Sequence, residues 1–211
     1  MPEKHLAQLM ERYPELQPVQ QSIRAAYEIL SAAYADQKKA LLCGNGGSSA
    51  DAEHVVGELM KGFLLPRNLS EAQTEAFTER YGGAGEYLAR RLQGALPAIS
   101  LGAHAALISA FANDVAADMV YAQQVYGYGQ PGDILLAFST SGNSVNVVNA
   151  VKVANVLSLK SVGLTGARGG RLLEECTCCI CLPATETARV QELTLPVYHA
   201  LCAMLEARFF G

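Results

Sequence analysis

Residues 134–148 read ILLAFSTSGNSVNVV, and this stretch decides the fold of the chain. Its first five residues form a continuous apolar run, which is typical of a strand covered on both faces in a parallel sheet. The hydroxyl-rich turn 139–144 follows, and a helical pattern then extends over 144–156. A buried strand that passes through a short turn into a helix is the repeating unit of a parallel α/β sheet.

The same unit recurs on both sides of this stretch. Further apolar runs that predict strands lie at 40–43, 98–101, 161–164 and 178–182. Further stretches that predict helices lie at 48–61, 104–111, 116–126, 168–175 and 187–209. The order predicts a three-layer α/β/α sandwich around a five-stranded parallel sheet. Ahead of the first strand, residues 5–36 predict two N-terminal helices, because Pro14 and Pro18 interrupt the helical pattern.

Residues 64–96 break this rhythm. A connection of this length is too long for a plain loop, so we expect an insertion or lid with short helices of its own. It contains Pro66, the glycine pair 82–83 and the basic pair Arg90–Arg91. The basic pair favours a solvated helix face over a phosphate contact.

The composition narrows the class of protein. The chain has 211 residues, of which 50% are hydrophobic and 17% charged, so we expect one domain, 1–211, with a buried core rather than a disordered chain. The formal net charge is -4 and no Lys/Arg run occurs, which excludes nucleic acid as an expected partner. No apolar run approaches a membrane span, and the N-terminus has no apolar signal segment, so we expect a cytoplasmic chain without membrane contact.

Four of the six cysteines lie in the segment 176–181, CTCCIC. A metal or redox cluster is one interpretation. The favoured one is a buried strand that uses Cys as a small hydrophobic residue, because the paired CxxC spacing of thiolate zinc sites is absent. In a cytoplasmic chain these thiols are expected to be reduced.

Ligands of open parallel sheets bind at the carboxyl ends of the strands, where two unusual turns fall. The first, residues 43–49, reads CGNGGSS, and its glycines let backbone N–H groups approach an anion at the start of a helix. It is neither a dinucleotide fingerprint nor a P-loop, which disfavours NAD binding. The second, residues 139–144, carries four hydroxyls that predict a neutral phosphate cradle. The alternative is a turn whose Ser and Thr only cap the helix, but four hydroxyls exceed what one cap needs.

Titratable side chains form a second constellation. His54 and Glu58 lie four residues apart on one predicted helix, so they share a face. Gln191 and His199 lie eight apart on the last helix and nearly share a face. Two imidazoles, a carboxylate and a carboxamide oxygen can bind zinc or a similar divalent ion, and they can also move protons. Spacing alone does not decide between these roles and an exposed His54 with a core-edge His199.

Together these segments resemble the SIS (sugar isomerase) domain, and most closely the phosphoheptose isomerases. The resemblance rests on CGNGGSSADAEH at 43–54, AFSTSGNSVNVVNAV at 137–151, LTGARGG at 164–170, and ARVQEL at 188–193 with His199. It covers roughly residues 15–210 without 64–96 and implies the flavodoxin-like SIS fold. It also implies a homotetramer with shared active sites that isomerises sedoheptulose 7-phosphate to D-glycero-D-manno-heptose 7-phosphate through an enediol(ate).

The resemblance implies a role for each matching residue. The substrate-binding residues are Asn45, Gly46, Gly47, Ser48, Asn113, Asp114 and Gln191, with Ser139, Thr140, Ser141 and Ser144 holding the phosphate. The ligands of a divalent metal, expected to be zinc, are His54, Glu58, Gln191 and His199. Glu58 and His199 are also the implied acid–base pair.

Departures from the family pattern leave the sugar open. Ala188 stands where many of these isomerases carry Asp, and Thr194 where many carry His. An isomerase of another phosphosugar is therefore an alternative. A second alternative is a non-catalytic SIS-domain regulator that binds a phosphosugar and acts on a protein such as a replication initiator. Residues 121–125 resemble that branch, but the branch loses the metal ligands that are complete here.

Overall fold

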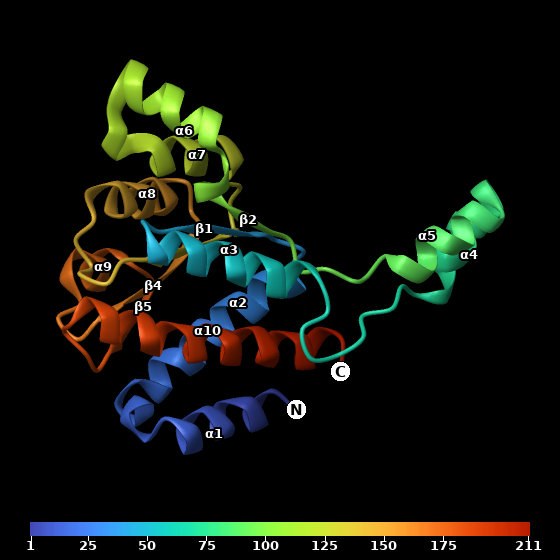
Figure 1. Ribbon diagram of the computed structural model, residues 1–211, viewed down its shortest axis with the longest axis horizontal. Helices are drawn as coiled ribbons and strands as arrows, with labels where there is room; N and C mark the ends of the chain where they lie inside the picture. Colours follow the sequence, from blue (N-terminus) through green and yellow to red (C-terminus); the bar gives the residue numbers. More distant parts are fainter.

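Five parallel strands form the centre of the molecule (Figure 1). The computed structural model describes all 211 residues, Met1–Gly211. The strands are β1 (Ala40–Cys43), β2 (Ala98–Ser100), β3 (Ile134–Phe138), β4 (Lys160–Gly166) and β5 (Cys178–Leu182). They lie in the order β2-β1-β3-β4-β5, and every neighbouring pair is parallel. The predicted five-stranded parallel sheet is confirmed.

Helices cover both faces of the sheet and make three layers. One face carries α2 (Gln20–Ala35), α3 (Gly47–Met60) and α10 (Thr187–Phe209). The other carries α7 (Val120–Tyr128), α8 (Val145–Val156) and α9 (Gly170–Glu175). Successive strand residues serve opposite faces, so Leu42 packs in the first core and Leu41 in the second. This is why the strands read as continuous apolar runs.

The remaining elements are short or peripheral. The helix α1 (Pro2–Arg12) packs on α10, and the 3₁₀ turn η1 (Pro14–Val19) leads into α2. Between β2 and α7 lie η2 (Leu101–Ala103), α6 (Ala105–Phe111), the π-helical turn η3 (Ala112–Ala116) and η4 (Ala117–Met119). None of the helices is both long and apolar enough to cross a membrane.

Residues 70–92, which we call the arm, extend away from the sheet (Figure 1). The arm is a helical hairpin of α4 (Glu71–Tyr81) and α5 (Gly83–Arg91). The helix α4 begins with a complete capping box, in which the Ser70 side chain accepts from the backbone of Gln73 and the Gln73 side chain accepts from the backbone of Ser70. No element of the body packs on either helix.

A buried ion pair anchors the base of the arm. Arg67 Nε donates to Glu206 Oε1 at 2.8 Å, and both side chains are almost fully buried. The other guanidinium nitrogens donate to the carbonyls of Glu58 and Leu59 at the end of α3. The Glu206 carboxylate also accepts from the backbone N–H groups of residues 63–65. These bonds tie the chain after α3 to the end of α10.

Candidate active site

The strand order places the site. The chain moves from β1 to β2 on one side and then to β3 on the other side of β1. The turns after β1 and β3 therefore leave the sheet in different directions and open a crevice between them. These are the two turns that the sequence singles out, and hydrogen bonds join them. Asn45 Nδ2 donates to Asn146 Oδ1 at 2.9 Å, and Asn146 Nδ2 donates back to Asn45 Oδ1 at 2.8 Å.

The turn after β3 is shaped by its glycine and by a bond between two serines. Gly142 adopts a φ of +68°, and a Cβ at this position would overlap the carbonyl oxygen of Gly169. The hydroxyls of Ser139 and Ser144 lie 2.9 Å apart. The Ser144 side chain does not cap α8, so the interpretation of these hydroxyls as mere helix caps does not hold for it.

A cavity of about 300 Å³ opens beside this turn. Thr140, Ser141 and Asn143 line it on one side, and Arg168 from the turn after β4 lines it on another. Hydroxyls, an amide and one guanidinium can hydrogen-bond a phosphate, whereas the Glu186 carboxylate, which also lines the cavity, opposes a second negative charge. Arg168 lies in a glycine-rich turn that, on its own, is only a weak sequence signal for a binding site. The turn reaches this cavity because β3 and β4 are neighbouring strands.

The turn after β1 is held against the last helix. Gly46 adopts a φ of +56°, and Gly47 begins α3. A Cβ on Gly47 would lie 2.7 Å from Nε2 of Gln191, so this glycine leaves the space that the Gln191 side chain fills. Ser48 is buried, and its backbone N–H donates to the Asn45 carbonyl at 3.0 Å. The predicted residues of this turn and Gln191 thus lie together.

His54, Glu58 and His199 form a cluster between α3 and α10. Nε2 of His54 lies 3.2 Å from Oε1 of Glu58 and 3.4 Å from Nε2 of His199. The second carboxylate oxygen of Glu58 is buried and has no hydrogen-bond partner, with Lys61 Nζ 3.5 Å away. Burial and the neighbouring His54 lower the pKa of His199, while Glu58 opposes the shift. An imidazole whose neutral form is favoured therefore lies in one cluster with a buried carboxylate, and Lys61 is the cation nearest to that carboxylate.

The expected metal ligands are only partly assembled. Three of the four converge as described, whereas Gln191 lies against Gly47. The two distances of 3.2 and 3.4 Å are close to the separation of about 3.4 Å between ligands of tetrahedral zinc. The donors are imidazole nitrogens and a carboxylate, which suit such an ion. Even so, no group of three or more His, Cys, Asp or Glu side chains is arranged to hold a metal.

Tyr198 and Asp51 extend this cluster, and the sequence reasoning missed both. The Tyr198 hydroxyl lies 2.9 Å from Nδ1 of His54 and donates to Oδ1 of Asp51 at 3.3 Å. Asp51 precedes His54 by three residues on α3, a spacing that places both on one face. For Tyr198, the only sequence feature that points to the cluster is its position next to His199.

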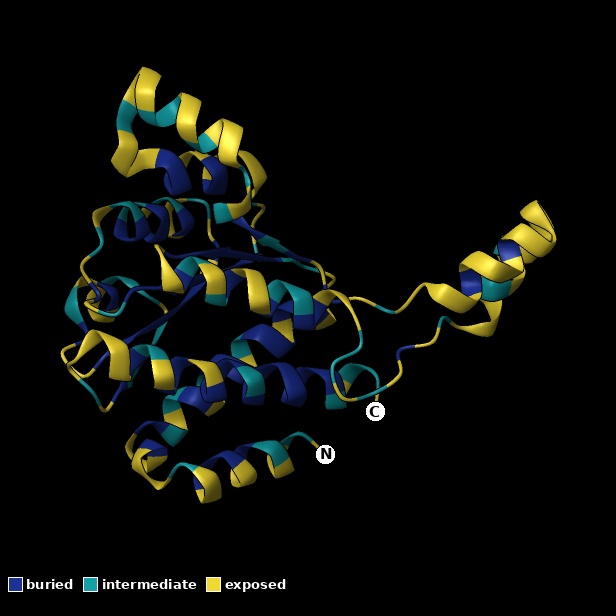
Figure 2. Ribbon diagram, viewed as in Figure 1, coloured by how far each residue is buried: buried dark blue, intermediate teal, exposed yellow.

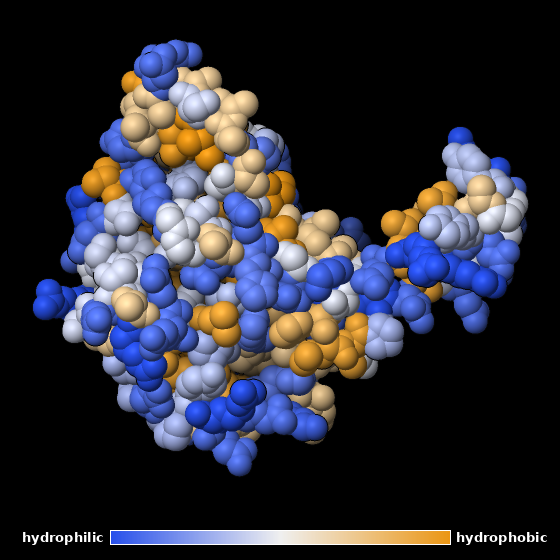
Figure 3. Space-filling view, viewed as in Figure 1, coloured by the Kyte–Doolittle hydropathy of each residue, from blue (hydrophilic) through white to orange (hydrophobic).

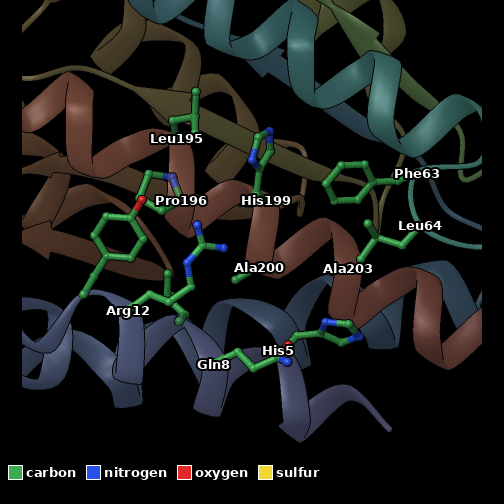
Figure 4. Close-up of a pocket in the computed structure, with 12 residues that line it drawn as sticks. His5, Gln8, Arg12, Phe63, Leu64, Leu195, Pro196, His199, Ala200 and Ala203 are labelled. Atoms are coloured by element: carbon green, nitrogen blue, oxygen red, sulfur yellow. The ribbon is translucent and has the colours of Figure 1, made fainter.

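His199 also faces a second cavity, of about 280 Å³, between α1 and α10 (Figure 4). His5, Gln8 and Arg12 rise into it from α1, and Phe63 lies beside His199. Nothing in the sequence connects α1 with the site, since the pattern of α1 indicates only an amphipathic helix. The packing of α1 on α10 places these residues on one side of the cavity.

One predicted pair lies apart from the rest. Asn113 and Asp114 are exposed in η3, and Asn113 Nδ2 donates to Asp114 Oδ1 at 2.8 Å. No hydrogen bond joins this pair to the turns after β1 and β3 or to the histidine cluster. The substrate-binding role of this pair therefore stays a prediction.

The cysteine segment forms the edge strand β5. All six cysteines are free, and the Sγ atoms of Cys179 and Cys181 lie 3.9 Å apart. Burial raises the pKa of the Cys176 thiol to about 12 and also raises the pKa of Cys178. These groups lie away from the crevice.

Comparisons with known proteins agree with this geometry. Residues 68–166 match the family model of the SIS domain. The phosphoheptose isomerase of Rhodospirillum rubrum is 35% identical over 185 residues, which are 88% of this chain and 85% of that protein. The phosphoheptose isomerase of Thiobacillus denitrificans is 38% identical over 176 residues, covering 82% and 76%.

Solved structures give the same result. The phosphoheptose isomerase GmhA from Neisseria gonorrhoeae superposes with a TM-score of 0.74 at 28% identity and covers 97% of this chain and 96% of its own. A phosphoheptose isomerase from Francisella tularensis gives a TM-score of 0.76 at 27% identity, covering 93% and 91%. The architecture, the two crevice turns and the long alignments lead to one assignment: this chain belongs to the phosphoheptose isomerase family of SIS-domain proteins.

Proposed function

We propose that this chain is an isomerase that converts sedoheptulose 7-phosphate to D-glycero-D-manno-heptose 7-phosphate. The observation that carries the proposal is the cluster in which His54 lies 3.2 Å from the Glu58 carboxylate and 3.4 Å from the His199 imidazole, whose pKa is lowered. Aldose–ketose isomerisation needs a base for the carbon-bound proton and a group that exchanges the oxygen-bound proton.

The phosphate would anchor the substrate. In this proposal it occupies the cavity at the turn 139–144, where hydroxyls, backbone N–H groups and Arg168 can all donate to it. The sugar would then extend toward Asn45, which bonds to Asn146 at the start of α8, and toward Gly47 and Gln191, which lie against each other. Anchoring one end of an open-chain sugar turns the proton transfer at the other end into a reaction between positioned groups.

Glu58 acts as the base. Its carboxylate removes the proton from C1 of the ketose, and the electron pair forms the C1–C2 double bond of an enediol(ate). His199 donates a proton to the C2 oxygen and takes one from the C1 hydroxyl. The protonated Glu58 returns its proton to C2, which yields the aldehyde at C1. The low pKa of His199 keeps the imidazole neutral at physiological pH, so it can both accept and donate.

We also propose a divalent ion, most simply zinc, at this cluster. His54, Glu58, Gln191 and His199 would hold it, since their nitrogen and oxygen donors suit zinc. When bound, such an ion polarises a carbonyl and stabilises developing negative charge on oxygen.

A homotetramer with shared sites is part of the proposal. Exposed Asn113 and Asp114 support it, because the only side-chain hydrogen bond of this pair joins the two residues to each other. In an assembly such a pair can serve the site of a neighbouring copy.

The direct test is turnover. Purified protein loaded with zinc is incubated with sedoheptulose 7-phosphate, and the aldose is followed by NMR, with fructose 6-phosphate and ribose 5-phosphate as competing substrates. We expect conversion of the heptulose alone and a loss of about 10²-fold or more in Glu58→Gln. Absence of turnover with every ketose phosphate, at full metal occupancy, would favour the phosphosugar-binding regulator. Unchanged turnover in Glu58→Gln would remove the assigned base.

A further inference from the structure

The arm has almost no core of its own. Its two helices pack only on each other, at a place where a Cβ on Gly85 would overlap the carbonyl oxygen of Phe77. Gly85 and Ala89 are its only buried residues, so the rest of the hairpin faces solvent (Figure 2). The helices have 11 and 9 residues. Isolated helices shorter than about 12–15 residues are marginal in water, so this hairpin requires further burial to be stable.

Large apolar side chains of the arm lie uncovered. Tyr87 is 63% exposed and Leu88 41%, and Tyr81 and Leu92 are also exposed. Figure 3 shows hydrophobic side chains along the upper edge of the arm and hydrophilic ones below. An exposed apolar edge with a polar rim is typical of a surface that another protein covers.

The arm does not cover this edge with its own body. Its base is fixed, because Gly94 N donates to the Arg67 carbonyl at 2.7 Å and Gly62 N donates to Gln93 Oε1 at 2.7 Å. Together with the buried Arg67–Glu206 pair, these bonds present the hairpin away from the sheet (Figure 1). The partner that covers it must come from outside the chain.

The charges on the arm indicate which partner. Glu71, Glu75 and Glu79 recur every four residues on α4, and none of them forms an ion pair within the chain. With Arg80 as its only basic residue, α4 stays acidic. The helix α5 ends in Arg90 and Arg91, and its single ion pair joins Arg90 to Glu86 at 2.6 Å. An acidic helix beside a basic one complements a second copy of itself when the two are related by a two-fold axis.

We propose that the arms of two copies of this chain pair about a two-fold axis and form a four-helix bundle. In this bundle α4 of one copy lies beside α5 of the other, which places opposite charges together and buries the tyrosines and leucines. Two paired hairpins supply the four helices of such a bundle, whose facing sides enclose an apolar core. The inference is independent of the proposed reaction, since no residue of the arm belongs to the site.

The absence of tryptophan gives a clean probe. In Leu88→Trp the single indole reports burial of the apolar edge through its fluorescence. We expect emission shifted to shorter wavelength at micromolar concentration and a return to the solvent-exposed maximum on dilution. Val156→Trp is the matched control, because residue 156 is 83% exposed on the body and gives the exposed maximum throughout. Tyr87→Trp replaces the probe if Leu88→Trp does not fold, as judged by circular dichroism.

Charge reversal then identifies the partner. In the Leu88→Trp background, Glu75→Lys with Glu79→Lys is expected to shift the emission to the exposed maximum, and the addition of Arg91→Glu is expected to restore part of the blue shift. Glu28→Lys with Glu174→Lys, two exposed acids of the body, is expected to leave the emission unchanged. Exposed emission at every concentration overturns the proposal. A blue-shifted emission that does not change on charge reversal also overturns the proposal. It would show that the apolar edge of the arm is covered by a surface other than a second arm.

Discussion

The hydroxyl oxygen of Tyr198 lies 2.9 Å from Nδ1 of His54. This contact joins α10 to α3, the two helices that carry the proposed catalytic groups. It occupies Nδ1 of the imidazole and leaves Nε2 to face Glu58 and His199. A histidine whose second nitrogen is held in this way keeps a fixed tautomer and ring orientation.

Tyr198→Phe removes this contact while keeping the ring. We expect kcat/KM for sedoheptulose 7-phosphate to fall about 10–100-fold, as for other outer partners of functional histidines. The melting temperature should change little, because the ring stays packed in the core. Tyr27→Phe is the control, since Tyr27 is also buried in that core. Equal kcat/KM for Tyr198→Phe and the wild type would show that the hydroxyl does not position His54.

The hydroxyls of the turn after β3 are expected to act on substrate binding. Ser141→Ala and Ser144→Ala should each raise KM for the phosphorylated sugar about tenfold or more, because a hydrogen bond to a charged group contributes about 1.5–3 kcal/mol. The turnover number should change less, since these groups are remote from the proton transfer. Steady-state kinetics measure both parameters. Ser109→Ala, in exposed α6, serves as the control. A KM that stays constant in both turn variants would place the phosphate elsewhere.

Acid should weaken the anchor of the arm. Burial raises the pKa of Glu206, but hydrogen bonds from Phe63 and Leu64 and the Arg67 guanidinium outweigh it and hold the pKa below the usual 4.5. The unfolded state therefore binds this proton first as the pH falls. The stabilisation is complete above pH 4.5 and is lost as the pH falls through the lower, folded-state value.

Glu206→Gln isolates this contribution. Near neutral pH we expect the variant to be less stable by about 3–5 kcal/mol, because Arg67 loses its buried partner. The difference from wild type should narrow as the pH falls below 4.5. Urea unfolding at a series of pH values measures both effects. Glu15→Gln, which breaks an exposed pair with Arg189, should change the stability by less than about 1 kcal/mol. A difference that widens toward acid pH would contradict the assignment.

The cysteines of the β5 segment are expected to react slowly. Burial raises the pKa of Cys176 from 9.0 to about 12, so the native chain holds about a thousandfold less thiolate at this residue than the unfolded chain. Alkylation by iodoacetamide, followed by mass spectrometry, should therefore be much slower in buffer than in urea. Rapid modification of Cys176 in the native protein would indicate a reactive thiol instead of a packed one.

The sequence was sufficient for the sheet and for the groups that follow its strands. Continuous apolar runs, as in 134–138, and the helical patterns between them predict a parallel sheet, because local periodicity carries the information for each element. The sequence also identified the turns at 43–49 and 139–144 as binding turns, because their glycines and hydroxyls are unusual for plain loops. Parallel strands all end at one edge of the sheet, so residues after them are expected to be neighbours.

The sequence by itself determined which residue types meet at that edge, and the tertiary structure decided which of them touch. The bond between Tyr198 and His54, the Asn45–Asn146 pair and the placement of Arg168 depend on packing between segments far apart in the chain. The direction of the arm is decided in the same way, by the buried pair between Arg67 and Glu206 together with the hydrogen bonds of Gly62 and Gly94 at its base. Periodicity reports the environment of a residue along its own helix or strand, but contacts between elements arise only when the core closes around them.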